Sequence, residues 1–291
     1  MAAENCVDKE NLGVTRCTKF PGPLKAMIIT PPGFSLTPAQ ALVSTNWQDA
    51  LQDVVADRAY LWPEFDKIED VSTESTYDEG INSDILADQG KYRFRAMINA
   101  GLCMHKNMTT HSGKGDRVFL IDKKNQIIGT EMANGNIRGF KLGLLNTEKI
   151  KISDGSVGTF SPVYFVLKDE TELSKKGLIV DGQDFVNELL SIVDVTLELV
   201  GSVSSSTIVV DAFISCDEDT PLTGLIAADF LLLTDAGAAQ TKTLAESTTV
   251  PGRYTLTAGT AFVDGTVTLV PSASLSVDAY EAGNTLAVNV P

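Results

Sequence analysis

The pattern of apolar and polar positions divides the chain into two kinds of sequence, which meet near residue 193. Before that point, helical and strand periodicities both occur. After it, every apolar pattern has the period of two that is typical of a half-buried strand. We therefore expect an extended N-terminal arm over residues 1–36, a first domain over 37–193 and a second domain over 194–291.

Two segments carry apolar residues at the three- to four-residue spacing of an amphipathic helix. The first runs from Pro38 to about Val55. Thr37 and Gln40 precede its apolar stripe at the spacing of a capping box, with proline at the first helical position. The second segment runs from Gly182 to Val193. Both segments are predicted to be helices that pack on a sheet.

Residues 91–167 are predicted to form a series of antiparallel strands. Cations alternate with Tyr92, Phe94 and Ala96, which indicates a half-buried strand. Lys123-Lys124-Asn125 separates two apolar runs, as the loop of a hairpin would. The connections are too short for parallel crossovers, so the first domain is predicted to be α+β, an antiparallel sandwich or barrel with flanking helices.

The N-terminal segment 1–36 is rich in proline. Pro21, Pro23, Pro31 and Pro32 surround the extended run Leu24–Thr30. Proline cannot donate a ladder hydrogen bond, so such a segment is predicted to be an arm or an edge strand.

The pattern of the second domain predicts strands and no helix. Val195 alternates with Leu197, and Tyr254 with Leu256, with turn residues between the runs. About seven short strands at this spacing predict an immunoglobulin-like β-sandwich. Cys216 is the only cysteine of this domain, so the sandwich would lack the disulfide of antibody domains.

The charge distribution distinguishes two parts of the chain and one acidic segment. Residues 1–190 hold 21 Lys and Arg against 26 Asp and Glu, whereas 191–291 hold 2 against 12, for a net charge of −15 over the whole chain. Such a chain is not expected to be a general nucleic-acid binder. The acidic stretch Pro63–Gly80 is interpreted as a solvated loop, and also as a surface that would repel another polyanion.

The chain is expected to be soluble and made in the cytoplasm. Its start lacks a basic segment followed by an apolar one, and no run of about 18 apolar residues occurs. The cysteines are expected to be reduced thiols because none forms a CxxC pair. They are Cys6, Cys17, Cys103 and Cys216.

No motif predicts a catalytic, cofactor or metal site. Cys103, His105 and His111 have metal-ligand side chains but lack a fourth ligand. The run Ser112–Asp116 contains glycine and lysine without phosphate-loop spacing, and it is interpreted as a hairpin loop. The acidic loop 217–219 is interpreted as a solvated turn, with calcium as the alternative. Without a GxSxG elbow and with two histidines, an enzyme is not expected.

Taken together, the Lys91–Leu167 strand block, the Pro38–Val55 helix and the appended strand domain resemble a bacteriophage virion protein. The run Pro251-Gly252-Arg253-Tyr254-Thr255-Leu256 resembles the PGxYTL strand of bacterial and phage Ig-like modules. The order of elements before residue 194 is similar to that of tail tube proteins of long-tailed phages.

This resemblance implies a virion structural protein, assembled in the host cytoplasm, whose subunits form rings that are usually hexameric. The rings would stack into a tube with other virion proteins, and DNA would pass through without specific binding. An acidic lumen would repel phosphates. The Ig-like domain would lie outside, and no membrane partner or cofactor is implied.

Two alternatives remain open. A capsid decoration or head–tail connector protein would also be acidic and β-rich. An Ig-like adhesion or carbohydrate-binding module belongs to a different class, and neither a leader segment nor an exposed aromatic cluster in the sequence favours it.

Overall fold

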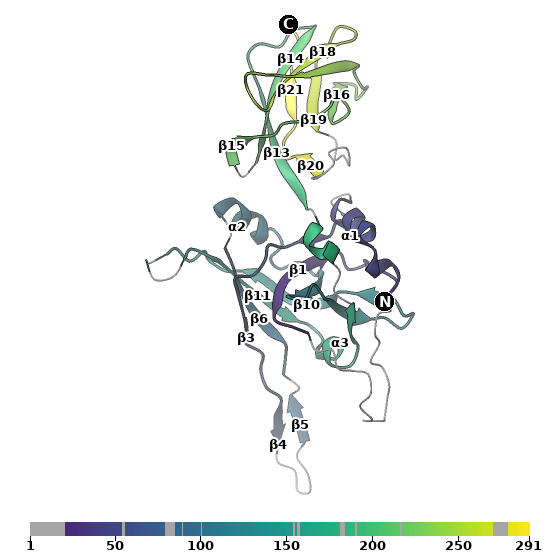
Figure 1. Ribbon diagram of the computed structural model, residues 1–291, viewed down its shortest axis with the longest axis vertical. Helices are drawn as coiled ribbons and strands as arrows, with labels where there is room; N and C mark the ends of the chain where they lie inside the picture. The colour runs from purple at the N-terminus through teal and green to yellow at the C-terminus, as the bar shows by residue number, and fades with distance from the viewer. Residues whose placement is uncertain are drawn as a thin grey trace. The chain divides into compact units, whose positions relative to one another are not determined.

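The structure is a computed structural model that describes residues 21–53, 56–78, 85–88, 90–99, 101–153, 155, 158–180, 184–189, 191–215, 217–269 and 279–291 (Figure 1). The fold is mainly β, with antiparallel sheets and few helices, as the sequence predicts. The chain divides into two compact units, Met1–Leu189 and Leu190–Pro291, beside the expected boundary at 193/194.

The first unit contains a sheet of ten strands and a separate strand pair. Its strands are β1 (Leu24–Thr30), β2 (Tyr60–Leu61), β3 (Lys67–Asp70), β4 (Thr76–Asp78), β5 (Ile85–Asp88), β6 (Arg93–Ile98), β7 (Arg117–Asp122), β8 (Ile127–Glu131), β9 (Ile137–Arg138), β10 (Phe140–Thr147), β11 (Ser161–Leu167) and β12 (Gly177–Val180). Its helices are η1 (Gln40–Leu42), α1 (Ser44–Leu51), α2 (Leu102–Thr109), α3 (Glu170–Ser174) and η2 (Asp184–Glu188).

Strand β10 connects two halves of this large sheet. Its first residues, Phe140 and Lys141, pair with β7, whereas residues 142–147 pair with β11. One half contains β1, β7, β8 and β12, and the other contains β3, β6, β10 and β11. Their inner faces enclose one apolar cluster, which includes Met27, Val118 and Phe165. The first unit is therefore a sandwich.

A second apolar cluster covers the other face of the β1–β7 half. Ile28 and Phe119 contact this layer together with Trp47 of α1 and Val186 of η2. The Trp47 and Phe119 rings meet edge to face, with centroids 5.0 Å apart. Strands β1 and β7 thus lie in a middle layer with both faces covered.

This middle layer corrects the expectation of an arm or edge strand at Leu24–Thr30. β1 pairs with β7 along its length and with β2 at Ile28 and Ile29, and residues 26–30 are buried. The prolines flank the strand instead of interrupting it, because Pro23 precedes β1 and Pro31 follows it. Residues 1–20 of the expected arm lie outside the described residues.

The capping box at Thr37 is confirmed. The Thr37 N–H donates to Gln40 Oε1 at 2.9 Å, and the Gln40 N–H donates to Thr37 Oγ1 at 3.2 Å. The capped element is the 3₁₀ turn η1, and the α-helix proper begins at Ser44. Of the expected stripe Val43, Trp47, Ala50 or Leu51, and Val54, the side chains of Trp47, Ala50 and Leu51 are buried. Val43 is 45% exposed, and Val54 lies outside the described residues.

The strand block contains two departures from expectation. α2 occupies 102–109, where strands were expected, and the Ser112–Asp116 loop connects α2 to β7 instead of joining two strands. The expected helix Gly182–Val193 is wrong, because its described residues 184–188 form the 3₁₀ turn η2 and Ile192 begins a strand. The hairpin at Lys123–Asn125 is confirmed, with Asn125 at φ 60°.

The acidic stretch Pro63–Gly80 is not a simple loop. β3 pairs with β6, and β4 pairs with β5, so residues 67–78 lie on one side of a long hairpin, and residues 85–88 and 90–98 lie on the other. Figure 1 shows the β4–β5 end of this hairpin standing beyond the sandwich of the first unit. We call residues 67–78 and 85–88 the acidic hairpin.

The second unit is a sandwich of two sheets. One has the order β17-β18-β14-β13-β20 with β15 beside β14, and the other has the order β16-β19-β21. The strands are β13 (Ile192–Leu199), β14 (Thr207–Ile214), β15 (Asp217–Pro221), β16 (Phe230–Thr234), β17 (Lys242–Glu246), β18 (Arg253–Ala258), β19 (Gly265–Leu269), β20 (Ala279–Ala282) and β21 (Leu286–Val288). β13 and β20 run parallel, and the other pairs are antiparallel.

The predicted inward positions of this unit are confirmed. Val195, Leu197, Tyr254 and Leu256 are all buried in one apolar cluster. The Tyr254 hydroxyl donates to the Leu222 carbonyl at 2.8 Å and accepts from the Leu225 N–H at 3.2 Å. Burial raises the pKa of Tyr254 to about 12. Cys216 lies outside the described residues.

Replacing Tyr254 with Phe is expected to lower the free energy of unfolding of the second unit by about 1–3 kcal/mol, because a buried carbonyl and a buried N–H lose their partner. Urea titration followed through amide resonances of β14 and β18 measures this unit alone. Tyr77→Phe, at an exposed ring in the first unit, is the control and should change the free energy of unfolding of the second unit by less than about 0.5 kcal/mol. Equal midpoints for the two variants would contradict the assigned role of the hydroxyl.

Candidate functional site

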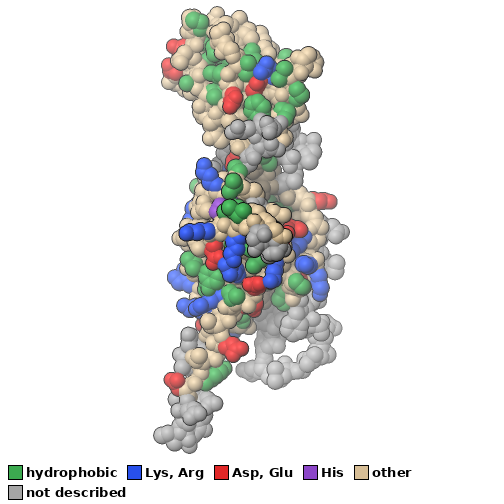
Figure 2. Space-filling view, turned by 90° about the vertical axis from the view of Figure 1, so that its left-hand side faces the viewer, with side chains coloured by type: hydrophobic (Ala, Val, Ile, Leu, Met, Phe, Trp, Pro, Cys, Tyr) green, Lys and Arg blue, Asp and Glu red, His purple; other side chains and the backbone are tan. Residues whose placement is uncertain are grey.

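The most distinctive polar feature of the described residues is a basic groove in the first unit. It has a volume of about 620 Å³, and its lining includes five cations and no acid. The cations are Lys91, Arg93, Lys114, Lys141 and Lys168. Figure 2 shows that Lys and Arg side chains gather on the first unit in the view drawn, although the whole chain is acidic.

Sheet pairing brings these cations together from distant parts of the sequence. Arg93 pairs with Val166 across β6 and β11. The Lys168 N–H donates to the Lys141 carbonyl at 2.8 Å, and the Leu167 N–H donates to the Tyr92 carbonyl at 3.0 Å. The start of β6, the start of β10 and the end of β11 therefore lie next to one another, and each carries a cation.

The loop after α2 closes the groove. Gly113 donates its N–H to the Leu145 carbonyl of β10 at 2.9 Å and has φ +78°. Glycine adopts this conformation without strain, which lets the loop reach β10 and present Lys114. Between the cations, the lining contains the apolar side chains Leu144 and Val166 and the ring of Tyr164.

The charges of the groove are not neutralised within the described residues. None of the five cationic side chains forms an ion pair there, and all four lysines are exposed. The half-buried Arg93 guanidinium has a buried Nε without a hydrogen-bond partner among those residues. Like charges held at one site raise its affinity for an anion, so the groove is suited to an anionic ligand.

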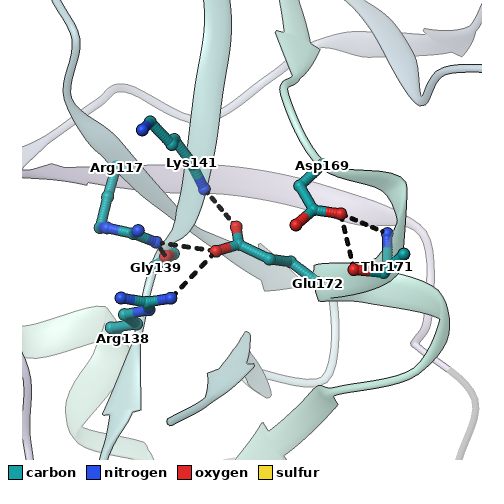
Figure 3. A network of polar contacts seen from close by, with 7 residues as sticks. All are labelled: Arg117, Arg138, Gly139, Lys141, Asp169, Thr171 and Glu172. Carbon is teal, nitrogen blue, oxygen red and sulfur yellow. Dashed lines mark hydrogen bonds and ion pairs between the residues drawn. The ribbon is translucent and has the colours of Figure 1, made fainter.

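A buried carboxylate fixes one side of the groove (Figure 3). Glu172 of α3 accepts from Arg117 at 3.2 Å, from Arg138 at 3.3 Å and from the Lys141 N–H at 2.6 Å. Arg117 also donates to the Gly139 carbonyl at 2.7 Å. Because Glu172 holds the backbone at Lys141, it positions that lysine without neutralising its ammonium group.

The turn from Lys168 into α3 is fixed by a cap. The Asp169 side chain accepts from the Thr171 N–H at 2.9 Å and from the Thr171 hydroxyl at 2.6 Å. These bonds lower the pKa of Asp169. The cap begins α3 directly after Lys168 and thereby sets where this lysine leaves β11.

The residues with metal-ligand side chains do not converge. Cys103 and His105 lie on α2, two positions apart, and therefore do not share a face. His105 Nδ1 lies 3.0 Å from Ser161 Oγ, and His111 packs against Tyr60 with ring centroids 4.4 Å apart. No group of three or more metal-ligand residues occurs in the described part of the chain.

The structure differs from two further expectations, which concern the cysteines and the 217–219 loop. Cys103 is disulfide-bonded, which corrects the expectation of reduced thiols, because folding can join cysteines that sequence spacing leaves apart. Cys6, Cys17 and Cys216 lie outside the described residues. Residues 217–219 begin β15 instead of forming a loop, and their side chains are not described.

No protein-family model, curated protein or solved structure matches the chain. Within the described residues, no helix has the length and apolar character needed to span a membrane.

Glu172→Ala is expected to destabilise the first unit by about 3–5 kcal/mol, because it leaves two arginines at the sandwich edge without their carboxylate. Urea titration followed at β7 amides measures the change. Glu170→Ala on the same helix is the control, with an expected effect below about 1 kcal/mol. If Glu172→Ala lowers the free energy of unfolding no more than Glu170→Ala does, the Glu172 network does not stabilise the first unit.

His111 makes the stability of the first unit depend on pH. Burial, with a smaller contribution from Lys114, lowers the pKa of His111 to about 4. The unfolded imidazole binds a proton below about pH 6.5, and the folded one does not until about pH 4. The free energy of unfolding should therefore fall as the pH falls from 6.5 toward 4. His111→Asn should flatten the part of this slope between pH 6.5 and 5, measured by urea titration, and an unchanged slope in this variant would contradict the assigned role of His111.

Proposed function

We propose that the chain is a virion structural protein that assembles into rings stacked as a phage tail tube. The acidic hairpin is the observation that carries this proposal. It extends a sandwich subunit with a long strand pair whose described tip residues are exposed, including Tyr77 at 62% and Leu86 at 48%. Large exposed apolar side chains on an extended hairpin favour contact with a neighbouring subunit.

The charge distribution supports the same proposal. Acidic residues dominate 63–80, with seven acids against Lys67. In a tube, the acids that remain exposed after assembly would repel phosphates, and DNA would pass without specific binding. The second unit, a strand sandwich, is then the proposed Ig-like domain displayed outside the tube.

Two alternative functions use the same structural features. A capsid decoration or head–tail connector protein would use the same hairpin and sandwich in a single ring. An Ig-like adhesion or carbohydrate-binding module would rely on the second unit. Of the aromatic side chains described there, Phe230, Tyr254 and Phe262 are buried and Phe213 is half-buried. The tail tube therefore remains our proposal.

Negative-stain microscopy of the purified chain tests this proposal, and stacked rings or hollow tubes are the expected result. In a shortened variant, Asn-Gly replaces residues 74–90 and joins Thr73 to Lys91, whose backbones are hydrogen-bonded across the hairpin. This variant should remain folded and lose the tubes, with circular dichroism as the check on folding.

Single rings that never stack would favour the connector. Monomers of the full chain at every concentration would overturn the proposal and leave the adhesion module. Tubes formed equally well by the shortened variant would show that the hairpin is not a subunit contact.

A further inference from the structure

We propose that the basic groove binds the acidic hairpin of a second copy of this chain. The inference rests on the proposed function, in which the chain associates with itself, and it names the two surfaces that meet. The groove supplies five cations without ion pairs to described residues. A ligand for it must supply several negative charges on a narrow segment.

The acidic hairpin has that chemistry. Two acids are already paired: Glu64, just before the hairpin, contacts Lys25 at 3.3 Å, and Glu69, within it, contacts Lys67 at 2.7 Å. The exposed carboxylates of Asp70, Glu74 and Asp78 form no ion pair with a described residue. The hairpin and the groove therefore each hold charges that the described part of the subunit leaves uncompensated, and the signs are opposite.

The apolar side chains of the two surfaces also correspond. The hairpin exposes Val71, Tyr77 and Leu86, with 40%, 62% and 48% of their surface accessible. The groove contains Leu144, which is 42% exposed, beside Val166. Contact would bury apolar surface in the middle of a ring of charge pairs, which is the usual arrangement of a specific protein interface.

A chain cannot place its own hairpin in its own groove. The strand ladder from Lys67↔Met97 to Asp70↔Phe94 continues through the Val71 N–H to Arg93 carbonyl and Thr73 N–H to Lys91 carbonyl hydrogen bonds. Lys91 and Arg93 themselves line the groove. Glu74 and Asp78 lie further along the hairpin, toward the β4–β5 end that Figure 1 shows beyond the sandwich. Folding back would break these bonds, and the partner must be another copy.

Charge-reversed variants test the contact. The groove variant carries Lys141→Glu and Lys168→Glu, and the hairpin variant carries Glu74→Lys and Asp78→Lys. The matched control, Lys123→Glu with Lys124→Glu, reverses two exposed lysines on the β7–β8 turn outside the groove. Circular dichroism verifies folding, and sedimentation velocity in about 50 mM salt measures self-association.

Each one-sided variant is expected to associate at least about tenfold more weakly than the wild type, because close charge pairs at an interface are replaced by like charges. The control should stay within about threefold. An equimolar mixture of the groove and hairpin variants, and a chain carrying all four substitutions, should both recover association, because the acidic groove then meets a basic hairpin.

A groove variant that associates as well as the control overturns this inference and leaves the proposed function standing. The same holds if the mixture fails to recover association. A wild-type chain that never associates overturns both. A fluorescent single-stranded oligonucleotide provides the last comparison: if the wild type binds it and the groove variant loses that binding while self-association is unchanged, the groove serves nucleic acid and the inference is wrong.

Discussion

The first unit depends on the burial of both faces of its middle layer. β1 and β7 are covered on one side by Trp47 of α1 and on the other by the β6–β11 half of the sandwich. A layer covered on both faces needs apolar residues at nearly every position, and β7 is buried from end to end. It also leaves little room at close approaches. At Gly129, an added Cβ would lie 2.8 Å from the Phe119 ring, so glycine lets β8 pass beside it.

The groove follows from this layering. β10 pairs first with β7 of the middle layer and then with β11, so its start lies at the point where the two halves meet. Glu172 fixes that point through two arginines and the Lys141 N–H. The packing of the core therefore determines where Lys141 and Lys168 lie, although neither lysine contributes to the core.

Sequence patterns predicted the parts of the fold that depend on near neighbours. The Thr37 capping box, the 123–125 hairpin and the alternation of β6 are local, and all three are confirmed. The expectation for β1 is wrong because the prolines flank Leu24–Thr30 without interrupting it, and because burial of both faces removes the period of two. The groove was missed because its lysines are far apart in the sequence and sheet register brings them together. The cations at the ends of β6, β10 and β11 are the signal present in the sequence, but only the sheet register shows that they meet.

The second unit is almost without free positive charge. Of its two cations, Arg253 is held by both carboxylate oxygens of Asp211 at 2.7 Å, which leaves Lys242 against eleven other acids. Copies of this unit therefore repel one another over a Debye length of about 8 Å at physiological ionic strength. In a crowded solution, this repulsion corresponds to a positive second virial coefficient that decreases as salt is added. The unit can thus act as an electrostatic spacer between copies of the chain.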